Sequence, residues 1–139
     1  MNKTTVITRA MVVILACPVA WGKVWAENCL DADSQSEMNF CASNEAKETD
    51  RELEAVYKKL LKKIDPEDQA RLRAAQSAWV VYRRKQCEFN TSGSIGGSIH
   101  PTVLAYCYAY FAEQQKKILQ EQLECEEGNL SCAGHGRSE

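Results

Sequence analysis

Cysteine is the residue type with the most evident chemistry in this sequence. The 139-residue chain has only two histidines but seven cysteines, which lie at positions 17, 29, 41, 87, 107, 125 and 132. Zinc sites usually draw on pairs of ligands two to four residues apart, and no two cysteines have that spacing. The sequence therefore favours disulfide bonds over a metal site, and we expect neither a metal nor another cofactor.

Side chains suited to catalysis are few and poorly arranged. The two histidines lie in a polar tail (His135) and in a glycine- and serine-rich loop (His100). In that loop Ser92, Ser94 and Ser98 have only His100 as a base, and no cysteine is expected to be a free nucleophile. Acidic residues are numerous, but a small helical protein offers little room for a cleft between paired carboxylates. We therefore expect a protein that is not an enzyme.

The glycine- and serine-rich loop is better suited to binding. It offers backbone N–H and hydroxyl donors, so it could enter a partner's cleft and donate hydrogen bonds to carboxylates there. The expected partner-binding residues are Ser92, Gly93, Ser94, Ile95, Gly96, Gly97, Ser98 and His100. The alternative is a plain turn between two helices, in which glycine supplies positive φ angles.

The first 26 residues have the order of a secretory signal peptide. Lys3 and Arg9 precede an apolar run over residues 10–20, and Ala26 offers a small residue for cleavage. The apolar run is shorter than the roughly 20 residues that a membrane helix needs. The segment Ile14-Leu15-Ala16-Cys17 also resembles a lipobox, in which Cys17 carries a lipid anchor. Cleavage after Ala26 predicts a periplasmic or secreted protein, and lipidation predicts an envelope-anchored one.

Removal of the signal peptide changes the charge balance. The full chain has 17 basic and 19 acidic side chains, and residues 1–26 contain three basic ones and no acidic one. The mature chain therefore has 14 basic and 19 acidic side chains, a net charge of −5. Such a chain is poorly suited to nucleic acid, and it favours a basic protein partner whose approach it accelerates.

Three helices are expected in the mature chain. Apolar residues recur at helical spacing over residues 34–64, 66–89 and 101–125. Asp65 and Pro66 are a helix cap and a first helical residue, so they mark the break between the first two helices. The fold class is all-α, a small antiparallel three-helix bundle stapled by disulfides. The expected divisions are a signal peptide at 1–26, the helical domain at 27–125 and a polar tail at 126–139.

Once Cys17 is removed or lipidated, six cysteines remain, an even number that predicts three disulfides. Cys125 lies at the opposite end of the expected bundle from the other helix cysteines, so it is expected to pair locally with Cys132. Two bridges then join the other four. We favour Cys41–Cys107 together with Cys29–Cys87, because Cys41 and Cys107 both lie on stripes expected to face the core.

Two further side chains on the second expected helix have structural interpretations. Trp79 lies on the apolar stripe and is expected in the core rather than in a ligand site. Arg83 follows one turn later, and we expect it to form a partly buried polar network with Asp50 and Gln76.

A set of residues from Cys29 to Leu119 forms a pattern that is also found elsewhere. It comprises Cys29, Gln35, Met38-Asn39, Cys41-Ala42, Asp50, Leu53, Tyr57, the run Ala75-Gln76-Ser77-Ala78-Trp79-Val80-Val81-Tyr82-Arg83 before Cys87, Gly96-Gly97-Ser98-Ile99, Cys107 and Leu119. This pattern resembles the LprI-type lysozyme inhibitor family. Three positions depart from the family pattern, namely Glu54, Arg84 and Gln115.

The resemblance implies an exported or lipid-anchored bacterial protein that binds and inhibits lysozyme. Animal-type lysozymes are strongly basic, which agrees with the negative charge of the mature chain. The expected function is therefore inhibition of lysozyme, with the loop in the enzyme's cleft. The alternative is a non-catalytic interaction or envelope-assembly module that uses an apolar helix face and does not bind lysozyme. A small hydrolase that cleaves the cell wall is a third, less favoured hypothesis.

Overall fold

The computed structural model describes residues 29–126 and 128–133, and these contain three α-helices and no strand. A 3-10 turn, η1 (Cys29–Asp31), precedes α1 (Gln35–Lys63). Helix α2 (Pro66–Asn90) follows, and a second 3-10 turn, η2 (Ser92–Ser94), leads toward α3 (His100–Leu123). The all-α class and the three-helix bundle are confirmed. The expected signal peptide, including Cys17, lies outside the described residues.

The starts of α1 and α2 are capped by side chains, whereas the start of α3 has no side-chain cap. The hydroxyl of Ser34 accepts a hydrogen bond from the Glu37 N–H at 3.2 Å, and the Asp65 carboxylate accepts one from the Asp68 N–H at 2.8 Å. Each cap satisfies an N–H group that has no partner within its helix. Because Pro66 follows Asp65 directly, the chain ends α1 and begins α2 within two residues.

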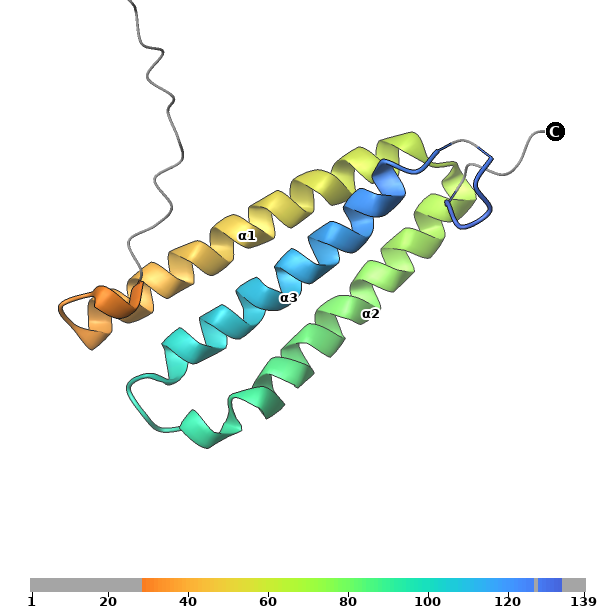
Figure 1. Cartoon of the computed structure of the whole chain (residues 1–139). Helices are drawn as coiled ribbons and strands as arrows, with labels where there is room; N and C mark the ends of the chain where they lie inside the picture. Colours follow the sequence, from red (N-terminus) through yellow and green to blue (C-terminus); the bar gives the residue numbers. More distant parts are fainter. Residues whose placement is uncertain (1–28, 127, 134–139) are drawn as a thin grey trace, which may run out of the picture.

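The three helices are packed unequally. Figure 1 shows α1 and α3 running parallel and close together, while α2 runs antiparallel to both and diverges from α1 after their shared turn. Small side chains allow the close approach of α1 and α3, because Ala42, Ala105 and Ala112 are all buried between them. Longer side chains of α2, among them Trp79 and Arg83, span the larger separation between α2 and the other helices.

The apolar core lies toward the α1–α2 turn. Leu53 and Leu60 of α1, together with its C-cap residue Ile64, pack against Ala112 and Leu119 of α3. Leu72 and Trp79 of α2 pack against this cluster from the third side, so the structural interpretation of Trp79 is confirmed. We call this half of the bundle the core end. The opposite half, with residues 29–42 and 87–107, is called the loop end.

The described residues contain three disulfides, and only one of the three favoured pairings is correct. Cys125–Cys132 is confirmed, with its Cα atoms 5.8 Å apart. The other bridges are Cys29–Cys41 and Cys87–Cys107, with Cα separations of 5.5 and 5.7 Å. The expected Cys41–Cys107 and Cys29–Cys87 pairs are therefore wrong.

The error in pairing has a geometric cause. The residues of α1 that face α3 include Ala42, and Cys41 lies one residue, or about 100°, away from it around the helix. The buried face of α3 contains Ala105, and Cys107 lies two residues away from it. Cys41 therefore bonds to η1, which folds back beside it, and Cys107 bonds to α2.

Within the described residues, none of the three helices combines the length and the apolar character required to cross a membrane.

Candidate functional site

The glycine- and serine-rich loop lies at the loop end of the bundle, between α2 and α3 (Figure 1). Its backbone forms a succession of hydrogen-bonded turns. The N–H groups of Ser94, Ile95, Gly97 and His100 donate to the carbonyls of residues 91, 92, 94 and 97, at 3.0 to 3.3 Å. These four N–H groups are therefore used within the loop, and contact with a partner depends on the other donors.

Two glycines allow these turns. Gly96 has a φ of +84°, a conformation that side chains with a Cβ rarely adopt. At Gly97 a Cβ atom would lie 3.1 Å from the carbonyl oxygen of Ser94, which is the acceptor of the turn itself. The positive φ of Gly96 is what the turn interpretation of the loop predicted, and a side chain at Gly97 would require the Ser94 carbonyl to shift slightly.

Ser94 and His100 bond to one another rather than standing free. The Ser94 hydroxyl donates to the carbonyl of Thr91 at 2.8 Å and also lies 2.8 Å from Nδ1 of His100. A hydroxyl has one hydrogen, so Nδ1 must donate to the Ser94 oxygen. It follows that Nε2 is the ring nitrogen of His100 that is left for a partner.

The remaining predicted loop residues are presented to solvent. Ser92, Gly93, Gly96, Gly97 and Ser98 are all exposed. Ile95 lies among them with 70% of its surface exposed, and Phe89, at the end of α2, is 74% exposed. The loop and the end of α2 therefore each present one large apolar group, in addition to the hydroxyl groups of the loop, a combination suited to contact with a protein.

The base of the loop is held by a covalent bond and a side-chain bond. Cys87–Cys107 joins the end of α2 to α3, and Cys87 is fully buried. The hydroxyl of Thr91 donates to the Cys87 carbonyl at 2.8 Å and so closes the last turn of α2. These contacts determine the position at which the loop leaves each helix.

Sequence reasoning did not identify a polar cluster that connects the loop to α1. Asn39 of α1 donates from Nδ2 to the Ser98 carbonyl at 3.2 Å, and Gln35 and Thr102 bond to the same side chain. The spacing of Gln35 and Asn39 puts them on one helix face, and this is the available sequence indication. Their partners in α3 and the loop are set only by the packing of the helices.

A second polar group crosses the middle of the bundle. The guanidinium of Arg83 bonds to the Asp50 carboxylate at 2.5 Å and lies 4.7 Å from the ring centre of Trp79 and 5.3 Å from that of Tyr108. The expected pairing of Arg83 with Asp50 is confirmed. Gln76 is not part of it, because its side chain accepts from Gln115 at 3.1 Å. These contacts join α2 to the other helices, which is a structural role.

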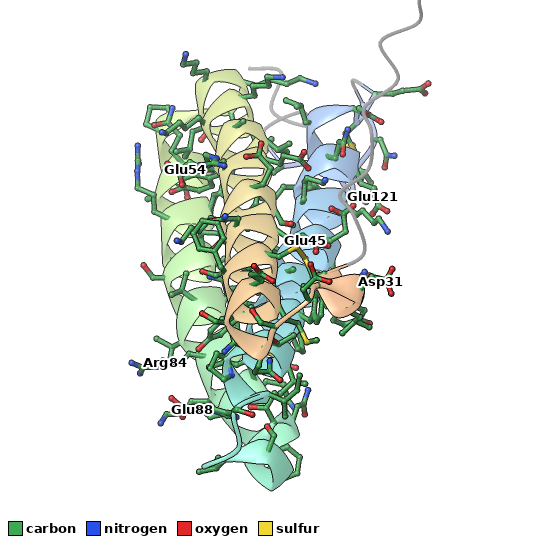
Figure 2. All side chains as sticks on the ribbon, turned by 90° about the vertical axis from the view of Figure 1, so that its left-hand side faces the viewer. Asp31, Glu45, Glu54, Arg84, Glu88 and Glu121 are labelled. Carbon is green, nitrogen blue, oxygen red and sulfur yellow. A yellow bond between two sulfur atoms is a disulfide. The ribbon has the colours of Figure 1, made fainter. Side chains whose placement is uncertain are left out.

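Acidic side chains are spread over the bundle rather than gathered at the loop. Figure 2 shows Asp31 on η1, Glu45 and Glu54 about two and a half turns apart on α1, and Glu121 on α3. Burial raises the pKa of Tyr106, and the nearby charge of Glu45 raises it further.

The described residues contain no group of three or more histidine, cysteine, aspartate or glutamate side chains placed to hold a metal ion.

Comparison with known proteins gives the family. The family model described as "Lysozyme inhibitor LprI" matches residues 26–119, which include all three helices apart from the end of α3, and the whole loop. The chain belongs to the LprI family. Gln115, one of the positions expected to depart from the family pattern, bonds to Gln76 in this LprI protein.

A related protein comes from Rhizobium meliloti. It is called "Uncharacterized protein R02472", and it is 28% identical over 113 residues, which cover 72% of this LprI chain and 81% of the relative. No solved structure shows significant similarity to the chain.

Proposed function

We propose that this LprI protein is an exported, non-catalytic inhibitor that binds lysozyme and blocks cell-wall hydrolysis. Family membership supports the inhibitory function. The observation that carries the mode of binding is the exposed loop of residues 92–100, ordered by its own turns and clamped at its base by Cys87–Cys107. A loop that is ordered before binding loses less conformational entropy when it docks.

The chemistry of the loop suits a cleft that contains carboxylates. Ser92 and Ser98 supply exposed hydroxyl donors. When Nδ1 of His100 donates to Ser94, Nε2 of the neutral ring is an acceptor, so it suits a protonated carboxyl group rather than a carboxylate. Ile95 supplies an exposed apolar contact at the same site. We infer that the loop enters the lysozyme cleft and that its donors pair with the catalytic carboxylates.

Charge supports a basic lysozyme as the partner. The chain without residues 1–26 has a net charge of −5, and its acidic groups are distributed over several elements. Attraction of this kind acts mainly on the rate of encounter and is screened by salt. Inhibition is expected to weaken between about 50 and about 300 mM NaCl, chiefly through slower association.

We also propose that the protein acts outside the cytoplasm, either free in the periplasm or medium or anchored by a lipid at Cys17. The three disulfides support an oxidising compartment. Mass spectrometry of the mature N-terminus distinguishes a chain that begins at Glu27 from one that begins at a lipidated Cys17.

The test is lysis of cell walls followed by turbidity, with purified mature protein and a basic lysozyme. The wild-type protein is expected to slow lysis. Replacement of residues 92–98 by an unrelated linker of equal length is expected to abolish the effect, with the fold checked by circular dichroism.

A matched control is available at the other end of the bundle. Residues 128–131 form an exposed turn within the Cys125–Cys132 bridge, so the same kind of replacement there is expected to leave inhibition intact. Full inhibition by the protein that lacks the loop sequence would overturn the loop mechanism. Turnover of peptidoglycan without added lysozyme would contradict the non-catalytic assignment.

A second candidate function is an envelope interaction module. Val81 and Tyr82 of α2 and Tyr110 and Ile118 of α3 are each more than half exposed. Tyr82 and Tyr110 both make edge contacts with Phe111, with ring centres 5.8 and 5.5 Å apart. An apolar surface of this kind suits a protein partner. This candidate is favoured if the wild-type protein leaves lysis by every lysozyme class unchanged.

A further inference from the structure

We propose that Asn39 is a positioning residue, which holds the loop of residues 92–100 against α1 in one conformation before lysozyme binds. The part of this inference that concerns binding rests on the proposed function. The part that concerns loop order rests on the geometry of the loop end alone.

Asn39 connects the loop to a helix far away in the sequence. Its Nδ2 group donates to the carbonyl oxygen of Ser98 at 3.2 Å, a contact between residues 59 positions apart. The turn bonds within the loop and the Cys87–Cys107 bridge involve only α2, α3 and the loop itself. The hydrogen bond from Asn39 therefore also fixes the loop relative to α1.

The amide of Asn39 is oriented by two other side chains. Its Oδ1 atom accepts from the hydroxyl of Thr102 at 2.6 Å and from Nε2 of Gln35 at 3.0 Å. Thr102 has no exposed surface, so its hydroxyl cannot exchange this partner for water. An amide flipped by 180° would direct its N–H donors at the Gln35 donor, and this conflict keeps Nδ2 directed at Ser98.

The hydrogen bond from Asn39 to Ser98 lies at the end of the bundle where α1 and α2 have diverged. At the loop end, α2 diverges from α1 (Figure 1). Because α2 leads into the loop, this side of the loop is not packed against α1. Asn39 connects α1 to the other side of the loop, at Ser98, which lies just before the start of α3. Without this hydrogen bond, we expect Gly97 and Ser98 to move independently of α1. Binding would then have to order the loop, and the lost conformational entropy would weaken the affinity.

Asn39→Asp is the sharpest test, because aspartate has nearly the same shape. The variant retains an oxygen that accepts from Thr102 and Gln35, but it has no N–H to donate to the Ser98 carbonyl. Loop amides, in particular those of Gly97 and His100, are expected to exchange hydrogen about tenfold faster, and the inhibition constant is expected to rise by about tenfold.

Asn44→Asp is the matched control for charge. Asn44 is an exposed residue of the same helix, so this variant makes the same chemical change without touching the loop. It is expected to match the wild-type protein in both measurements. Thr102→Val removes the hydroxyl that orients Asn39 and is expected to resemble Asn39→Asp, whereas Thr102→Ser restores the hydroxyl and is expected to restore both values.

Each result decides one part of the proposal. Loop exchange that is equal in the Asn39→Asp and Asn44→Asp proteins overturns the claim that Asn39 orders the loop. Faster exchange with unchanged inhibition overturns its role in binding while lysozyme inhibition by the wild type still stands. A wild-type protein that does not inhibit overturns the proposed function and the binding role with it, and the exchange measurement still decides whether the loop is held. The Thr102 pair provides the same comparison if Asn39→Asp fails to fold.

Discussion

The two ends of the bundle are held together by different interactions. At the core end, leucine and isoleucine side chains of α1 and α3 are buried against one another, and α2 adds Leu72 and Trp79. At the loop end the buried groups are small or polar, and two disulfides and a cluster of amide and hydroxyl groups connect the elements. Hydrophobic burial is strong but non-directional, whereas hydrogen bonds and disulfides specify geometry.

The two ends of the bundle are therefore expected to have different roles. The core end supplies most of the stability, and the loop end maintains the shape of the part proposed to meet a partner. A change at the core end should therefore affect the free energy of unfolding most, and a change at the loop end should affect loop order and binding more than it affects stability.

The largest loss of stability is expected from Leu60→Ala, at the core end. Leu60 is 1% exposed, and truncation of a buried leucine costs about 2–5 kcal/mol because a cavity remains. Phe89→Ala at the loop end removes a larger side chain that is exposed, so its expected effect on stability is within about 0.5 kcal/mol. Urea denaturation measures both. If Phe89→Ala lowered the free energy of unfolding as much as Leu60→Ala does, the core end would not be the main source of stability.

An intermediate effect is expected from removal of the disulfide at the base of the loop. Conversion of Cys87 and Cys107 to serine opens a link between residues 20 positions apart, and the chain-entropy estimate for this loop is about 3 kcal/mol. The equivalent change at Cys125 and Cys132, which are 7 positions apart, is expected to cost about 2 kcal/mol.

The same two variants are expected to separate more clearly in function. Loss of the Cys87–Cys107 bridge should weaken inhibition of lysozyme even at temperatures where the protein stays folded, because the base of the loop is freed. Loss of the Cys125–Cys132 bridge should not. Thermal unfolding and the lysis assay, run on the same samples, check this, and equal inhibition by the two variants would show that the clamp is unimportant for binding.

Among the contacts between helices, the smallest effect is expected at Lys116, between the two ends. Its ammonium group bonds to Glu52 of α1 and to Glu113 at 2.7 and 2.6 Å. Burial acts to lower the pKa of Lys116, but the hydrogen bonds and charges of the two glutamates outweigh it and raise the pKa above its ordinary value. Both carboxylates are partly exposed, so Lys116→Met is expected to cost less than about 1 kcal/mol at neutral pH.

The sign of the pH dependence follows from this raised pKa. The folded protein holds the Lys116 proton more tightly than the unfolded chain, so the stabilisation is fully present below the ordinary lysine pKa, about 10.4, and is lost as the pH rises through the folded value. Urea midpoints measured from pH 8 to pH 11 should fall more steeply for wild type than for Lys116→Met. Parallel curves would show that the ion pairs do not contribute.

Local sequence was sufficient for the elements of this fold. The expected helices agree with the observed ones to within about two residues, because Ser34, Asp65 and Pro66 determine helix starts through bonds to their immediate neighbours. The loop was located in the same way, since a run of serine and glycine cannot continue a helix. The local Cys125–Cys132 bridge was also predictable, because its two cysteines are only seven positions apart.

Contacts between distant elements were not predictable to the same degree. Cys41 and Cys107 were assigned to core-facing stripes, but a rotation of about 100° per residue around a helix separates a core position from its neighbour. The position of Asn39 beside Ser98 depends on the same rotation, together with the close approach that Ala42, Ala105 and Ala112 allow.

Sequence by itself therefore determined that the chain is a helical, disulfide-bonded protein with a single glycine- and serine-rich loop between its last two helices, and it indicated the LprI family. Tertiary structure alone decided which cysteines pair, that the core lies at one end, and that Asn39 of α1 bonds to the loop at Ser98. The physical reason is the distance along the sequence between the residues that interact. Helix caps and turns depend on neighbours a few residues away, whereas pairing and loop anchoring depend on the rotation and spacing of whole helices, which only the packing of side chains determines.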